Sequence, residues 1–183
     1  EEFFGKDNVT LILGDNLFFG QDFASKLLSA AQNKGATVFA YQVNEPKNFG
    51  VLEIDKDDKI ISVEEKPNNP KSDYAITGLY YFDNNVLSIA KNIKKSKRNE
   101  KEITDVIDAY LQKGELKFEM LSRGFAWLDT GTYDSLQEAG QFVQTIENRQ
   151  GLKIACLEEI SFYKGWISEE ILREQGKKQK QTS

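Results

Sequence analysis

Two apolar runs, far apart in the sequence, each stop at an aspartate, and this feature limits most strongly how the chain can fold. Residues 9–16 read VTLILGDN, and residues 125–132 read FAWLDTGT. A short apolar run that is stopped by polar turn residues predicts a strand buried on both faces, because it has no polar side to offer to water. We therefore predict an α/β fold in which Asp15 and Asp129 each stand at the carboxyl end of a strand.

The position of these aspartates is typical of a cation site. In open α/β sheets, ligands bind beyond the carboxyl ends of the strands, and carboxylates there can hold a hard divalent cation against a phosphate. For Asp15 and Asn16 the alternative is a simple turn, which that stretch alone favours, since Gly, Asp and Asn are the commonest turn residues. A second strand-end aspartate, Asp129, suits the other side of one metal ion.

Composition limits the catalytic mechanisms that the chain can use and the cellular compartment in which we expect it. The chain has 183 residues, 39% of them hydrophobic and 29% charged, with a net charge of −5, one cysteine and no histidine. Without histidine, Ser-His-Asp and Cys-His nucleophile schemes are excluded, whereas transfer chemistry based on metal, lysine and carboxylates remains. The negative charge argues against a non-specific nucleic-acid surface. No run is long enough to span a membrane, the first residues do not resemble a signal peptide, and one cysteine cannot form an internal disulfide, so we expect a cytoplasmic protein.

The remaining chain alternates strand and helix patterns. Helical spacing predicts helices over residues 22–33, 86–90, 103–113 and 133–149, and β patterns predict strands over residues 37–43, 75–82 and 116–121. The first helix would join two parallel strands in a βαβ crossover. Between residues 49 and 64, alternating apolar and polar residues around an acidic turn predict two antiparallel strands.

Lys66 and Gly78 each have two interpretations. Lys66, between a strand end and a proline, is either a solvated surface lysine, which is favoured when it is taken alone, or a phosphate ligand. Gly78, inside an apolar strand, marks either a β-bulge or the close approach of a ligand or another backbone, with equal weight. Thr104 and Asp105 are expected to cap the helix that begins at residue 103, and Glu100 is interpreted as a favourable acidic residue near the positive end of that helix.

Six motifs, LILGDNLFFG, NFGVLE, EEKP, TGLYYFD, EITD and WLDTGT, occur here in a specific order. In this order the chain resembles the sugar-phosphate nucleotidylyltransferases, most closely the bacterial glucose-1-phosphate thymidylyltransferases, from residue 9 to about residue 166. Each motif is weak alone, but the six in register are specific. The resemblance implies a Rossmann-like, GT-A-like α/β domain with a mixed, mainly parallel sheet flanked by helices and a small antiparallel sugar-binding hairpin.

The resemblance also implies roles for single residues. Asp15 and Asp129 match the pair that binds Mg²⁺, and Lys66 matches the lysine that binds the sugar phosphate, a role suited to a compact ammonium. The implied sugar contacts and pocket walls are Gly50, Glu65, Glu100, Tyr80 and Trp127.

The implied reaction is attack by the glucose 1-phosphate oxygen on the α-phosphorus of dTTP. It gives pyrophosphate and dTDP-glucose, a precursor for dTDP-rhamnose and cell-surface polysaccharide. The expected partners are these two small-molecule substrates, with no nucleic acid and no membrane, and the family implies a homo-oligomer, typically a tetramer. The alternatives are uridylyl, cytidylyl or adenylyl transfer within the same family, and a non-catalytic module that binds sugar phosphates.

The chain departs from the family pattern in three places. The family's glycine-rich triphosphate loop and base-recognising residues precede the GDN strand and are not among these 183 residues, so we expect an N-terminally incomplete domain without measurable transferase activity by itself. Phe49 stands where relatives commonly have tyrosine, and Tyr163 where they often have an arginine of a feedback site. We expect residues 1–150 to form the catalytic and sugar-phosphate-binding portion, 151–176 a helical extension and 177–183 a mobile tail.

Overall fold

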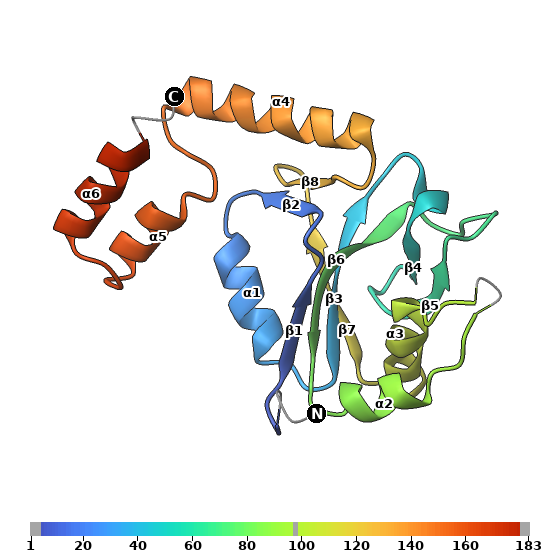
Figure 1. Ribbon diagram of the computed structural model, residues 1–183. Coiled ribbons are helices and arrows are strands. Elements are labelled where there is room, and N and C mark those ends of the chain that lie inside the picture. The colour runs from blue at the N-terminus through green and yellow to red at the C-terminus, as the bar shows by residue number, and fades with distance from the viewer. Residues whose placement is uncertain (1–4, 97–98, 180–183) are drawn as a thin grey trace. The chain divides into compact units, whose positions relative to one another are not determined.

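The structure, a computed structural model, describes residues 5–96 and 99–179. Its contacts divide the chain into two units, Glu1–Gly131 and Thr132–Ser183. The first unit carries the strands, and the second is helical (Figure 1). Among the described residues, no helix combines the length and the apolar character that crossing a membrane requires.

The first unit is built on a mixed six-stranded sheet in the order β5-β4-β6-β3-β7, with β1 also paired to β6. Only β3 and β7 pair in parallel, and the other described pairs in this sheet are antiparallel. The mixed α/β class predicted from the sequence is confirmed, but the prediction of a mainly parallel sheet is wrong, because β6 lies antiparallel between β1 and β3 and the β4–β5 hairpin adds further antiparallel pairs. The strands are β1 (Val9–Ile12), β3 (Ala36–Gln42), β4 (Gly50–Ile54), β5 (Ile60–Glu65), β6 (Tyr74–Phe82) and β7 (Leu116–Leu121).

Helices cover both faces of this sheet (Figure 1). On one face, α1 (Phe23–Ala31) packs through Ala30 against Phe39 and Leu79. On the other face, α2 (Val86–Asn92) and α3 (Ile103–Gln112) build the larger core cluster, in which Ile107 and Tyr110 are fully buried. The helices predicted at these places are confirmed.

The prediction for β1 is only partly right. A strand forms there, and it runs in the same direction as β3, but the antiparallel strand β6 lies between them. Leu11 and Ile12 are 38% and 57% exposed, so the predicted burial on both faces is wrong. Within the described part of the chain β1 pairs with β6 alone. Its apolar side chains stay exposed because burial depends on the neighbours that the tertiary fold provides and not on the apolar sequence.

The second unit contains α4 (Tyr133–Gln150), α5 (Leu157–Tyr163) and α6 (Glu169–Gln179). The predicted long helix is confirmed as α4. It begins with a reciprocal capping box between Thr132 and Ser135 and ends at Gly151, whose φ is 69°. Lys177, expected in a mobile tail, belongs to α6, and residues 180–183 of that tail lie outside the described residues.

Candidate active site

A cleft of about 340 Å³ opens in the first unit where two strands separate along one edge of β6. β1 pairs with β6 at residues 79–82, whereas β4 meets β6 at Ala75, and Gly78 lies between these two pairings. The cleft is lined by Leu13, Asp15, Asn16, Asn48, Phe49, Gly50, Glu65, Lys66, Ile76, Gly78, Tyr80, Ile103, Thr104, Trp127, Asp129 and Gly131. All predicted site residues except Glu100 are in this set.

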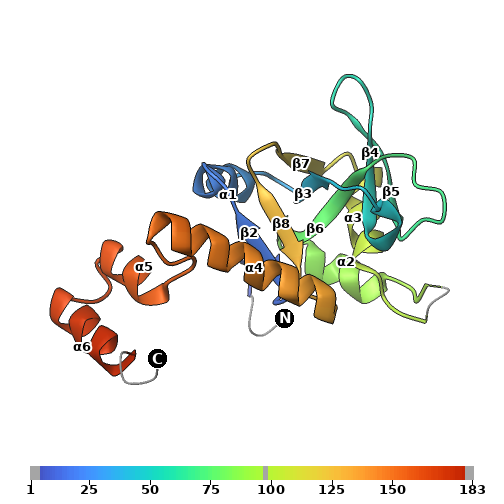
Figure 2. The same cartoon turned by 90° about the horizontal axis from the view of Figure 1, so that it is seen from above.

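One end of the cleft, here called the carboxylate end, is formed by Asp15 and Asp129. A two-stranded antiparallel sheet of β2 (Asn16–Phe19) and β8 (Ala126–Asp129) places Asn16 opposite Asp129, and Figure 2 shows these strands side by side. The backbone N–H of Thr130 donates to the carbonyl of Asp15 at 2.7 Å. A Cβ added to Gly131 would lie 3.4 Å from Asp129 Oδ2 and 3.9 Å from Asp15 Oδ2. The two carboxylates therefore face one small space, which a glycine leaves open.

Asn16 links the carboxylate end to the sheet. Its Oδ1 accepts from the Gly78 N–H at 3.2 Å and from Trp127 Nε1–H at 2.6 Å, and its Nδ2 donates to Asp15 Oδ1 at 2.7 Å. These bonds use both polar atoms of the amide and orient the indole of Trp127 and the carboxylate of Asp15. Sequence reasoning treated Asn16 only as a turn residue, and the available signal was its place next to Asp15 in the Gly-Asp-Asn stretch.

The bulge interpretation of Gly78 is confirmed, and the group that approaches its backbone is the side chain of Asn16 rather than another backbone. The register between β3 and β6 shifts between the pairs Val38–Tyr80 and Ala40–Ile76, which is a bulge around Gly78. A Cβ on Gly78 would also lie 2.6 Å from Asn16 Nδ2, so another residue's side chain approaches this backbone closely. Glycine is required here because any other side chain would displace Asn16.

The opposite end of the cleft, here called the hairpin end, is formed by the β4–β5 hairpin and α3. Gly50 and Glu65 are paired in register, and Thr104 Oγ1–H donates to Glu65 Oε2 at 3.1 Å. The prediction that Thr104 caps α3 is therefore wrong, since the N-cap residue is Glu102 and the hydroxyl of Thr104 points to the hairpin. A Cβ on Gly50 would lie 2.9 Å from Thr104 Cγ2, so this glycine allows close packing of strand and helix.

Lys66 follows β5 directly and has a left-handed backbone, with a φ of 41°. This conformation is uncommon for a residue other than glycine. The Lys66 N–H donates to the carbonyl of Phe49 at 3.0 Å, and this bond fixes the chain where it leaves the strand. The structure therefore places Lys66 on the cleft through a constrained backbone.

Aromatic side chains form the walls of the cleft. Tyr80 is 4% exposed, and burial, followed by the charges of Glu65 and Asp15, raises the pKa of its hydroxyl far above the usual range, so it remains neutral. The ring of Phe49 lies edge-on to Trp127 with centroids 5.1 Å apart. An aromatic ring at position 49 thus packs on the cleft wall without needing a hydroxyl.

Two other residues singled out from the sequence lie away from the cleft. Glu100 is exposed in the loop before α3, and its carbonyl accepts from the Ser96 N–H at 2.7 Å. Tyr163 ends α5 in the second unit and is 77% exposed. Their implied roles in sugar binding and feedback remain predictions.

Residues 1–146 match the family described as Nucleotidyl transferase, and the chain belongs to this family. It is 56% identical over 175 residues to a glucose-1-phosphate thymidylyltransferase of Neisseria meningitidis, a match that covers 95% of this chain and 61% of the relative. It is 50% identical over 173 residues to the protein of that name from Mycolicibacterium smegmatis, covering 94% of this chain and 60% of the relative. The chain thus spans about three fifths of the length of these relatives.

Solved structures agree with this assignment. A Bacillus anthracis protein assigned as a glucose-1-phosphate thymidylyltransferase, crystallised with sucrose, superposes with a TM-score of 0.67 at 42% identity, covering 77% of this chain and 56% of that one. A UDP-glucose pyrophosphorylase in complex with UDP-glucose superposes with a TM-score of 0.68 at 22% identity, covering 79% and 59%. The second likeness concerns the fold alone.

Proposed function

We propose that this chain forms the sugar-phosphate-binding and metal-binding part of a glucose-1-phosphate thymidylyltransferase, which transfers the thymidylyl group of dTTP to glucose 1-phosphate. The observation that carries the proposal is the convergence of Asp15, Lys66 and Asp129, from distant segments, on one cleft. The names of relatives at 50–56% identity support thymidylyl transfer over uridylyl transfer, for which the structural likeness is at 22% identity.

Mg²⁺ would be held by Asp15 and Asp129. It usually binds proteins through one or two carboxylates and completes its shell with water and substrate phosphates. Two carboxylates facing the space at Gly131 fit this habit. The bound ion would supply charge neutralisation on the reacting phosphates.

The other cleft residues would bind and orient the acceptor sugar phosphate. The Lys66 ammonium would pair with the phosphate, and Glu65, oriented by Thr104, would accept hydrogen bonds from sugar hydroxyls. Gly50 offers backbone, while Trp127 and Phe49 offer apolar ring surface to the sugar. Catalysis of phosphoryl-type transfer is mainly alignment and electrostatic stabilisation, which these groups suit. A homo-oligomeric assembly and a cytoplasmic location remain predictions.

The test measures the binding of glucose 1-phosphate to the chain by titration calorimetry and by the ³¹P resonance of the ligand. We expect saturable binding that strengthens when Mg²⁺ is added. Glucose alone and inorganic phosphate alone should each bind more weakly than glucose 1-phosphate. The matched variant Lys66→Ala should lose most of the affinity. If the wild-type chain gives no saturable binding, or binds inorganic phosphate equally well, the proposed function is wrong.

A further inference from the structure

The loop of residues 66–73 joins β5 to β6, and its first residue is Lys66. At its far end the hydroxyl of Ser72 donates to the carbonyl of Leu52 at 2.5 Å, and the carbonyl of Asp73 accepts from the Val43 N–H at 2.9 Å. Pro67 and Pro70 restrict the backbone between the two ends. A change at one end of so short and stiff a segment is therefore transmitted to the other end.

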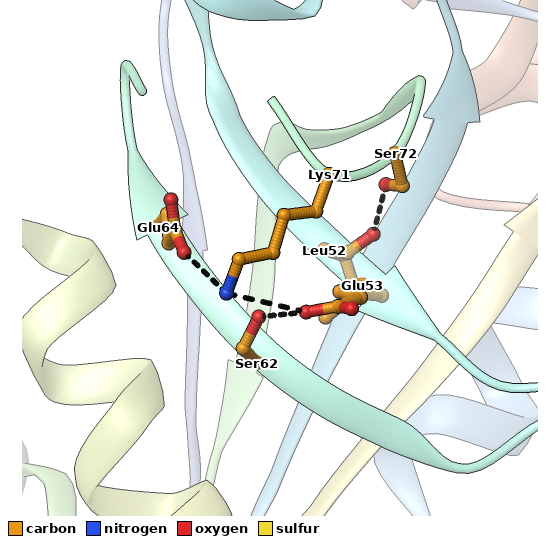
Figure 3. A network of polar contacts seen from close by, with 6 residues as sticks. All are labelled: Leu52, Glu53, Ser62, Glu64, Lys71 and Ser72. Atoms are coloured by element: carbon orange, nitrogen blue, oxygen red, sulfur yellow. Dashed lines mark hydrogen bonds and ion pairs between the residues drawn. The ribbon is translucent and has the colours of Figure 1, made fainter. Parts of the chain in front are cut away.

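Lys71 connects this loop to both strands of the hairpin, as Figure 3 shows. Its Nζ lies 3.0 Å from Glu64 Oε1 on β5 and 3.7 Å from Glu53 Oε2 on β4, and the Ser62 hydroxyl also donates to Glu53. These contacts, here called the Lys71 bridge (Lys71, Glu53 and Glu64), lie on the hairpin face that carries Glu53, Ser62 and Glu64. Gly50 and Glu65 belong to the opposite face and line the cleft.

We propose that Lys71 is a positioning residue for the hairpin end of the cleft, one that holds Glu65 and Lys66 in place for the sugar phosphate by joining the 66–73 loop to β4 and β5. The proposal rests on the proposed function, because it assigns Lys71 to the acceptor-binding end of that site. Lys71 itself is not among the residues that line the cleft.

Two features of the backbone explain why the Lys71 bridge matters. Side chains alternate across a strand, so fixing Glu64 on one face also fixes the orientation of Glu65 on the other. The left-handed backbone of Lys66 persists only where the surrounding structure holds it, and the Phe49 carbonyl and the anchored loop are what hold it. Without Lys71, Glu53 and Glu64 would also lack the cation that lies between them on adjacent strands.

The Lys71 bridge should persist at physiological pH. The hydrogen bond to Glu64, together with the charges of Glu64 and Glu53, raises the pKa of Lys71 above its ordinary value. A cation whose pKa is raised on folding keeps its contribution at lower pH and loses it only as the pH rises through the raised value. Lys71 is 55% exposed, so the effect of the bridge on binding should be moderate.

Replacing Lys71 would also weaken binding if its charge simply attracted the phosphate from a distance. The variant Glu64→Gln separates this explanation from positioning by the Lys71 bridge. If charge alone acts, removing a negative charge near the cleft strengthens phosphate binding. If the Lys71 bridge positions Glu65 and Lys66, removing Glu64 as its partner weakens binding. The two explanations therefore predict opposite signs.

The experiment compares wild type, Lys71→Met, Lys71→Arg and Glu64→Gln by calorimetry with glucose 1-phosphate and by NMR hydrogen exchange of the Lys66 amide without ligand. Lys71→Met should raise the dissociation constant about fivefold and speed exchange of the Lys66 amide by a similar factor. Glu64→Gln should raise the constant about threefold, and Lys71→Arg should restore both readouts. The control Lys26→Met removes an ion pair to Glu119, 3.6 Å long, on the α1 side of the sheet and should change neither.

Each outcome decides one of the two proposals. Tighter binding by Glu64→Gln, or Lys66 amide exchange in Lys71→Met equal to that in Lys26→Met, overturns the positioning role while leaving the proposed function intact. Absence of glucose 1-phosphate binding by the wild type overturns the proposed function. The positioning role of Lys71 is then tested by amide exchange alone, and unchanged exchange of the Lys66 amide in Lys71→Met overturns that role as well.

Discussion

The two ends of the cleft are held in different ways. At the carboxylate end, strand pairing between β2 and β8 and the hydrogen bonds of Asn16 fix Asp15 and Asp129. At the hairpin end, main-chain bonds hold Glu65 and Lys66 within the hairpin, but the charged side chains are set by one hydroxyl, one left-handed residue and exposed ion pairs. Main-chain pairing fixes a charge more rigidly than exposed side chains do. We therefore expect changes at the carboxylate end to affect the cation strongly, and changes at the hairpin end to affect the sugar phosphate in graded steps.

Asp129→Asn should give the largest effect, because it keeps the side-chain shape but removes one of the two charges that face Gly131. A unit charge about 4 Å from a cation is worth a few kcal/mol near a protein surface, so cation affinity should fall about 100-fold. Binding of Mn²⁺, followed by electron paramagnetic resonance, measures it, and glucose 1-phosphate affinity without metal should hardly change. Asp22→Asn, at the residue that immediately precedes α1, is the control. Wild-type Mn²⁺ affinity in Asp129→Asn would refute the metal assignment.

Lys66→Ala should come next. A charge-assisted hydrogen bond is worth about 1.5–3 kcal/mol, so the dissociation constant for glucose 1-phosphate should rise roughly tenfold to a hundredfold. Mn²⁺ binding should stay at the wild-type level. Lys47→Ala replaces a nearby exposed lysine that does not line the cleft and should leave both constants unchanged. Equal losses of glucose 1-phosphate affinity in Lys66→Ala and Lys47→Ala would show that Lys66 is a solvated surface lysine and not a phosphate ligand.

Asn16→Ala should damage the carboxylate end through its hydrogen bonds. Trp127 Nε1–H and the Gly78 N–H would lose their acceptor, at a cost of about 2 kcal/mol in the free energy of unfolding, and Mn²⁺ affinity should fall about tenfold because Asp15 is no longer oriented. Urea denaturation and Mn²⁺ titration measure the two effects. Asn84→Ala, which removes a half-buried asparagine that donates to the carbonyls of Gly5 and Asp7 and does not line the cleft, is the matched control. Unchanged Mn²⁺ affinity in Asn16→Ala would mean that Asp15 is oriented without it.

Thr104→Val should give the smallest effect. The change removes the hydroxyl that donates to Glu65 and keeps the branched shape against Gly50. We expect about fivefold weaker glucose 1-phosphate binding, by about 1 kcal/mol for one lost hydrogen bond, and no change in Mn²⁺ binding. Thr104→Ser keeps the hydroxyl and should bind like the wild type. If Thr104→Ser is as weak as Thr104→Val, packing against Gly50 matters and the hydrogen bond does not.

Periodicity predicted most elements because each depends on contacts that repeat along a short segment. The β4–β5 hairpin, the buried strand β6 and the helix α4 all follow from local patterns. The site residues followed from the order of motifs rather than from periodicity, and the structure gathers them, apart from Glu100, on one cleft.

The features that the sequence did not reveal depend on partners far along the chain. β2 was missed because Gly-Asp-Asn indicates a stop, whereas pairing with β8, more than 100 residues away, continues the chain as a strand. The roles of Asn16 and Thr104 depend on Trp127 and Glu65, which no local pattern connects to them. The exposure of β1 likewise depends on which strands reach its edge.

The attachment of the β4–β5 hairpin to the sheet has a consequence for cooperativity. β4 and β6 share a single registered pair, Val51 with Ala75, whereas β3 is registered with β6 along most of its length. A segment joined by so little main-chain pairing opens at a lower free energy than the sheet itself. We therefore expect the hairpin to open before the sheet does, so the amides of β5 should exchange with solvent before those of β3.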